Sequence, residues 1–139
     1  MKETMYRIIV PGEPKAKARA RWAKFGMYNP KESVDYENRI RLFFTEQNKD
    51  AAPIEGPVTM TILAYFSIPK SASKKAQAAM IEHRISPTKR PDADNIIKSF
   101  ADSLNGLAYK DDSQICVVMC KKVYDEKPHC VCIVEGCRG

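Results

Sequence analysis

The sequence lacks the features that mark membrane-spanning and exported proteins. No apolar run is long enough to cross a bilayer, and the start MKETMYRIIV lacks the charged, apolar and small regions of a signal peptide. There is also no internal repeat and no low-complexity tract. We therefore expect a cytoplasmic protein without membrane contact. The 139 residues, 44% of them hydrophobic, predict a single domain over residues 1–139.

The cysteines are also unlike those of a disulfide framework or a zinc knuckle. Their number is odd, and the paired C-x2-C spacing is missing. The five are Cys116, Cys120, Cys130, Cys132 and Cys137. They occur in β-rich runs, where alternate residues share one face. We expect reduced thiols that pack as small hydrophobes, with a zinc site that includes His129 as the alternative.

Positive charge, in contrast, is abundant and unevenly placed. The formal net charge is +6, and residues 13–31 and 70–90 each hold six Lys or Arg against one Glu, so the remaining residues sum to −4. Two basic segments around an acidic remainder predict a polyanionic partner such as DNA. The candidate DNA-binding residues are Lys15, Lys17, Arg19, Arg21, Lys24, Lys74, Lys75, Lys89 and Arg90.

The first basic segment also contains the aromatic residues Trp22, Phe25 and Tyr28. Cations bind phosphates and aromatic rings stack on unpaired bases, so this arm is a candidate nucleic-acid contact. A hairpin whose aromatic side chains pack inward fits the same pattern. The periodicity favours neither interpretation.

The hydrophobic pattern predicts an α+β fold, with a small mixed or antiparallel sheet packed with helices. The predicted strands are residues 5–10, 58–68, 115–124 and 129–135. The predicted helices are residues 30–48, capped by Asn29; a short helix capped by Ser71 or Ser73 that ends near 82; and one that begins after Arg90-Pro91, with Asp92 or Asp94 as its N-cap, and ends at Asn105-Gly106. We expect the last two strands to form an antiparallel hairpin. Both of its faces are apolar, which leaves room for a subunit interface.

Aspartates gather in residues 90–114, RPDADNIIKSFADSLNGLAYKDDSQ. Asp92 and Asp94, the first acidic group, stand at the start of the predicted helix, with Lys98 one turn later. Asp111–Asp112, the second acidic group, follows a glycine-containing turn. Mg²⁺ and Mn²⁺ prefer hard oxygen ligands, and such ions assist phosphodiester hydrolysis. We expect the two groups to converge within a few ångströms on open, water-accessible ground.

Each of these residues also has an ordinary structural explanation. Asp92 and Asp94 can be helix caps, each contributing about 1 kcal/mol. Lys98 can be an i,i+4 partner of Asp94, contributing about 0.3 kcal/mol. The second acidic group can consist of turn residues. Asp102 and the first member of that group can support the site or only be solvated.

The run RPDADNIIKSFADSLNG followed by KDDSQ resembles the signature of the RusA-type Holliday-junction resolvases, small endonucleases common in phages and prophages. The flanks PGEPKAKARAR and PKSASKKAQAAM are also similar, so the resemblance extends over most of the chain. It implies metal-ligand roles for Asp92, Asp94 and Asp112. It also implies that Lys98 is an essential base or phosphate contact.

The resemblance further implies a homodimeric, Mg²⁺-dependent endodeoxyribonuclease, with Mn²⁺ as a possible substitute. Such an enzyme resolves four-way DNA junctions in recombination and repair by symmetric paired nicks that leave 5′-phosphate and 3′-hydroxyl ends. A two-fold dimer suits a two-fold substrate. Three alternatives stay open: a non-catalytic basic DNA-binding module, a nuclease for flaps or other branched DNA, and a zinc-stabilised interaction protein.

Overall fold

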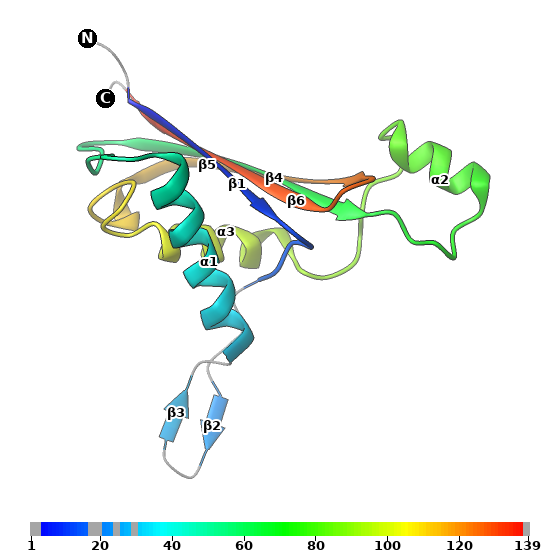
Figure 1. The fold of residues 1–139 in the computed structure, drawn as a ribbon, viewed down its shortest axis with the longest axis horizontal. Helices are drawn as coiled ribbons and strands as arrows, with labels where there is room; N and C mark the ends of the chain where they lie inside the picture. Colours follow the sequence, from blue (N-terminus) through cyan, green and yellow to red (C-terminus); the bar gives the residue numbers. More distant parts are fainter. Residues whose placement is uncertain (1–3, 17–20, 24–25, 29–30, 138–139) are drawn as a thin grey trace.

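The chain forms a four-stranded sheet with two helices on one face, and its α+β class is as predicted (Figure 1). The computed structural model describes residues 4–16, 21–23, 26–28 and 31–137. The elements are β1 (Met5–Pro11), β2 (Arg21–Ala23), β3 (Gly26–Tyr28), α1 (Lys31–Gln47), β4 (Val58–Ser67), α2 (Lys74–Ile81), α3 (Ala93–Ser103), the 3-10 turn η1 (Asp112–Gln114), β5 (Ile115–Asp125) and β6 (His129–Gly136). No helix in the described ranges is both long enough and apolar enough to cross a bilayer.

The strand order in the sheet is β1-β6-β4-β5. The two C-terminal strands form where predicted, but the predicted hairpin is wrong, because β4 lies between them. Residues 126–128 cross the end of β4, where Ser67 pairs with Asp125 and Tyr65 with His129. Two interstrand spacings amount to about 10 Å, which a link of this length spans. A short polar link can therefore cross the end of an intervening strand as well as it can form the turn of a hairpin.

The pairing of β4 with β5 is parallel, whereas β6 pairs antiparallel with both β1 and β4. Parallel neighbours need a long crossover connection, and here that connection contains α2 and α3. The loop before α3 lies near the end of β5, because Lys122 Nζ donates a hydrogen bond to the Lys89 carbonyl oxygen at 2.6 Å. After α3 the chain reaches the start of β5 through η1. Hence α3 runs antiparallel to β5.

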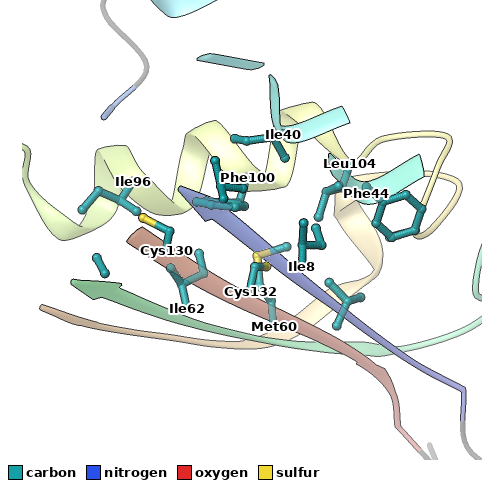
Figure 2. Packing of buried hydrophobic residues seen from close by; sticks show 14 of the residues in the cluster. Ile8, Ile40, Phe44, Met60, Ile62, Ile96, Phe100, Leu104, Cys130 and Cys132 are labelled. Carbon is teal, nitrogen blue, oxygen red and sulfur yellow. The ribbon is translucent and has the colours of Figure 1, made fainter. Parts of the chain in front are cut away.

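The hydrophobic core lies between the sheet and the helices α1 and α3 (Figure 2). Alternate residues of β4 are fully buried, as the period of a strand requires. Ile96, Phe100 and Leu104 contribute the apolar stripe of α3 and its C-terminal end, and all three are 0% exposed. This stripe fixes the rotation of α3 about its axis and leaves the polar side of the helix in solvent.

Two cysteines behave as the predicted small hydrophobes. Cys130 and Cys132 are 0% exposed in the core, where Tyr36 donates its hydroxyl proton to Cys130 Sγ at 3.6 Å. Burial raises the pKa of Cys130 to about 11 and that of Cys132 still further. The deprotonated thiolate that binds zinc is therefore disfavoured at both positions. Cys116, by contrast, is exposed.

His129 lies on the other face of the sheet, away from the buried cysteines. Its ring stacks on Tyr65, with 4.3 Å between the ring centroids. Within the described ranges, no three His, Cys, Asp or Glu side chains gather closely enough to hold a metal ion. The zinc site that would join His129 to the cysteines is not formed, because neighbouring strand residues face opposite ways.

The two edges of the sheet differ. At β1, the Gln47 side chain accepts a hydrogen bond from the Ile9 N–H and donates one to its carbonyl oxygen, both at 2.8 Å. Arg39 donates to the Pro11 carbonyl oxygen at 2.7 Å. At β5, no hydrogen bond from another described residue covers the outer edge. This edge is apolar, since Val117, Val118 and Met119 are 56%, 42% and 50% exposed. One edge is thus capped and the other open.

The peripheral elements largely follow the predictions. Of the two candidate caps for α2, Ser73 is the one used, since its hydroxyl accepts a hydrogen bond from the Ala76 N–H at 3.1 Å. The predicted N-cap of α1, Asn29, and its predicted first helical residue, Pro30, lie outside the described residues. β2 and β3 form a separate small sheet that projects from the body near the start of α1 (Figure 1). The packing of this arm's aromatic side chains lies outside the described part of the chain.

We predict that Cys132→Ser lowers the free energy of unfolding by about 1–3 kcal/mol, because a core hydroxyl would lack a partner. The exposed Cys116→Ser should change it by less than about 0.5 kcal/mol. Urea unfolding followed by fluorescence measures both. Equal effects would contradict the packing role of Cys132, and unfolding of the wild type by a chelator would support the zinc-stabilised alternative.

Candidate active site

The first acidic group stands at the start of α3. Asp92 is the N-cap residue, and its carbonyl oxygen accepts the first helical hydrogen bond, from the Ile96 N–H at 3.0 Å. Its carboxylate, however, makes no capping hydrogen bond. Asp94 lies in the first turn, where the helix dipole favours negative charge, and it forms no ion pair with the described side chain of Lys98. The capping and ion-pair explanations are therefore not realised, and all three side chains are exposed.

The loop before α3 is anchored to the sheet. Besides its bond to the Lys89 carbonyl oxygen, Lys122 Nζ lies 5.2 Å from the centroid of the Phe66 ring, and Lys89 Nζ lies 5.9 Å from it. These contacts fix the backbone just before the first acidic group. Lys89 and Arg90 are exposed there. Two cations thus precede the two carboxylates in the chain. A bound phosphodiester would need cations to hold its phosphate and carboxylates to hold the metal ion.

The second acidic group divides into a structural member and an available one. The Asp111 carboxylate accepts a hydrogen bond from the Ser113 N–H at 3.1 Å and so caps η1. Hydrogen bonding from Ser113 lowers the pKa of Asp111. Asp112, one residue later, is half-buried, and its carboxylate makes no hydrogen bond or ion pair with the other described residues. The turn explanation therefore applies to Asp111 and not to Asp112.

Tyr109 shows where Asp112 lies relative to α3. Its hydroxyl donates a hydrogen bond to the Ala101 carbonyl oxygen at 2.6 Å, and its side chain is fully buried. Burial raises the pKa of Tyr109, and the negative charges of Asp112 and Asp102 raise it further. Asp112 therefore lies near Tyr109, whose hydroxyl is bonded to the C-terminal half of α3.

The two acidic groups do not converge within one chain, so this prediction is wrong. Asp92 precedes the first residue of α3, whereas Asp112 follows the helix and begins η1. With 11 residues, α3 spans about 16 Å at 1.5 Å per residue. The turn after α3 is tight, because the Leu107 and Ala108 N–H groups both donate to the Leu104 carbonyl oxygen. The chain then leads directly into β5 instead of returning along the helix.

The donor chemistry of the first acidic group nevertheless fits a divalent metal ion. Mg²⁺ takes one or two protein carboxylates together with water and substrate phosphate, at an accessible position. Asp92 and Asp94 provide two exposed carboxylates in one helical turn. A third acid from elsewhere in the same chain is not supplied among the described residues.

The predicted DNA-binding residues that the structure describes are exposed, as such contacts require. They are Lys15, Lys74, Lys75, Lys89 and Arg90. Lys74 and Lys75 open α2, which stands away from the sheet (Figure 1). Arg21 belongs to β2, whereas Lys17, Arg19 and Lys24 lie outside the described residues. Exposed cations thus occur both at the acidic site and on α2.

A cavity of about 860 Å³ lies between the end of β4 and α2. Its polar lining includes Lys70, Gln77, Glu82 and Glu126, but none of the candidate acids. The candidate site is therefore an open surface and not this cavity. An open surface suits a polymeric substrate better than a small molecule, which is bound in an enclosed pocket.

Three residues that hold these groups in place, Tyr109, Gln114 and Lys122, were given no structural role by the sequence interpretation, although Gln114 belongs to the KDDSQ signature. For Gln114 a signal was present, since a Gln three residues after an Asp is the spacing of a capping box, and η1 contains that box. For Tyr109 and Lys122 no local pattern indicates the role, because their partners lie on other elements.

Comparison with known families identifies the class of protein that presents this surface. The family model described as endodeoxyribonuclease RusA matches residues 11–135, a range that includes both acidic groups. The chain therefore belongs to the RusA endodeoxyribonuclease family and is an enzyme of the nuclease class. It is also 36% identical over 128 residues to the uncharacterized protein YqaN of Bacillus subtilis (strain 168), a match that covers 88% of this chain and 89% of that protein.

Proposed function

We propose that this protein is a divalent-metal-dependent endodeoxyribonuclease that resolves four-way DNA junctions by symmetric paired nicks. The observation that carries the proposal is the exposed pair Asp92 and Asp94 at the start of α3, beside the cations Lys89 and Arg90. Carboxylates that have no partner in the described part of the chain, adjacent to cations, match the needs of a metal and a phosphodiester together. Membership of the RusA family supports the same chemistry.

Each residue has a separate part in the proposed reaction. Asp92, Asp94 and Asp112 would hold Mg²⁺ or Mn²⁺, which when bound supplies a more acidic water and offsets negative charge on the phosphodiester. Lys98 follows Asp94 by four residues, on the same side of α3, and would contact the scissile phosphate or orient the attacking water. Lys89 and Arg90 would bind neighbouring phosphates. The products would carry 5′-phosphate and 3′-hydroxyl ends.

The proposed enzyme is a homodimer joined through the open edge of β5. A long, uncharged edge strand is a template for another strand, and proteins normally protect such an edge. Between Ile115 and Cys120 the edge carries no charge, and its three central side chains are exposed. Pairing with the same edge of a second copy would cover these side chains and satisfy the backbone groups. The resulting two-fold axis suits paired nicks in a two-fold junction.

The same pairing would bring the two acidic groups together across the interface. Because α3 runs antiparallel to β5, the start of α3 lies near Lys122 and its end leads to Ile115. An antiparallel two-fold pair whose axis passes at Val118 sets residues with the same side-chain direction opposite each other. It brings Lys122 near Ile115 of the partner subunit. Asp92 and Asp94 would then lie next to Asp112 of the partner subunit. We propose that each metal site is completed in this way, which accounts for two groups that stay apart within one chain.

We predict that Asp94→Asn and Asp112→Asn each reduce Mg²⁺-dependent nicking of a labelled four-way junction at least about 100-fold. Loss of residues that only support a metal ligand already reduces affinity or activity 10- to 100-fold. Junction binding without metal should persist, since the basic residues are unchanged. Four-way, flap and linear DNA compared side by side test the substrate class. Undiminished nicking by both variants would remove the catalytic assignment, and binding without any nicking by the wild type would favour the DNA-binding module.

We predict that the two inactive chains complement each other when co-expressed with different tags and purified as a mixed dimer. One of its two sites would combine an intact Asp94 with an intact Asp112, and the other would lack both. The mixed dimer should therefore nick one strand of the junction without resolving it, as gel electrophoresis of the products would show. If each site instead used acids of one chain, both sites would be defective and no nicking would return.

We predict that Val118→Lys converts the dimer to a monomer, because two lysines would face each other near the axis. Met5→Lys is the matched control, since Met5 is 57% exposed at the opposite, capped edge of the sheet. Sedimentation measures the mass of each variant. If Val118→Lys forms a dimer as stable as the Met5→Lys dimer, the interface is not at the edge of β5.

A further inference from the structure

The side-chain amide of Gln114 joins the second acidic group to a distant loop. Its Oε1 accepts hydrogen bonds from the backbone N–H groups of Lys110 at 2.9 Å and Asp111 at 3.0 Å. Its Nε2 donates to the carbonyl oxygens of Ile54 at 2.8 Å and Gly56 at 2.9 Å. Four hydrogen bonds from one side chain thus connect η1 and the turn before it to residues 54–56, the loop that leads into β4.

An amide is the only side-chain group that can make this set of bonds. It offers one oxygen that accepts twice and one nitrogen that donates twice, and both capacities are fully used. A glutamate of the same shape keeps the oxygen acceptor but sets a carboxylate oxygen against the carbonyls of Ile54 and Gly56. A leucine of similar volume makes none of the four bonds. The position therefore requires glutamine.

These bonds act on Asp112 because this residue lies between the groups that they fix. Asp111 precedes it and Gln114 follows it by two residues, whereas its own carboxylate has no hydrogen-bond partner among the described residues. The nearby ion pair of Lys110 with Glu55, at 3.3 Å, joins two exposed side chains and contributes little. The turn around Asp112 is thus closed by the bond from Ser113 to Asp111, and the amide of Gln114 is the side chain that ties it to the loop before β4.

We infer that Gln114 is a positioning residue that sets the Asp112 carboxylate for metal binding, an inference that rests on the proposed function. In this role Gln114 contacts neither the metal nor the DNA. It acts indirectly, by holding the backbone of η1, which contains Asp112. A looser turn would leave Asp112 able to reach the metal only part of the time, so the affinity for the ion would fall while the DNA surface stayed intact.

The test uses the full chain with Gln114→Leu and the isosteric Gln114→Glu. Gln47→Leu is a matched control, since Gln47 also bonds a backbone N–H and a backbone carbonyl of a distant strand, at the opposite edge of the sheet. Amide hydrogen exchange of Lys110 and Asp111 in metal-free protein should accelerate at least about tenfold in both Gln114 variants and not in the control. Calorimetric Mn²⁺ titration should show affinity about 10- to 100-fold weaker in the same two variants.

Junction binding without metal should be equal in all four proteins. The inference is overturned if the Gln114 variants bind Mn²⁺ as the wild type does, or if Gln47→Leu weakens Mn²⁺ binding as much as they do. Because exchange and metal titration need no cleavage, they separate this inference from the proposed function. A wild type that binds Mn²⁺ but nicks no DNA refutes the nuclease proposal, while the difference between the Gln114 variants and the control still decides the role of Gln114.

Discussion

The parallel pairing of β4 with β5 is the constraint on which the rest of this structure depends. Two parallel neighbours cannot be joined by a tight turn, so the chain between them must travel back over the sheet, and α3 is the helix that does so. Its apolar stripe packs on the core through Ile96 and Phe100, which leaves its polar side in solvent. Aspartates close to one another in the sequence are therefore held at opposite ends of a rigid helix. The separation of the acidic groups is a result of topology and not of a loose loop.

The same topology explains why one chain does not complete the proposed metal site, although the backbone beside each acidic group is anchored to other elements. The start of α3 is tied to the sheet by Lys122, and η1 is tied to the body by Tyr109 and Gln114. Each half is supported by side chains from other elements, although the carboxylates themselves make few contacts. Among the described residues, the carboxylates of Asp92, Asp94 and Asp112 have no hydrogen-bond or ion-pair partner, whereas the backbone beside them is fixed. Such an arrangement suits the proposed metal binding, because a backbone that is already ordered loses less entropy when a ligand binds.

Local sequence patterns predicted the elements well, and the non-local arrangement poorly. The alternation of β4 and the apolar stripe of α3 each arise from neighbours within one element, so periodicity identified them. Which strands pair depends on contacts between distant residues, and the polar link 126–128 is compatible with a hairpin or a crossing. For the same reason, Asp111 and Asp112 could not be told apart until the hydrogen bond from Ser113 was seen. The signature acids were found because their residue types and order resemble those of a known family, and that family is confirmed.

The hydrogen bonds from α1 to β1 have a consequence for assembly. Gln47 and Arg39 occupy backbone groups of β1 that a neighbouring strand would need. A sheet with two open edges can recruit copies without limit and grow into a filament, whereas a sheet with one blocked edge can accept a single neighbour. If two copies pair through β5, as proposed, edge-to-edge growth would end at two chains. A few polar side chains of α1 at the opposite edge would thus limit the number of chains.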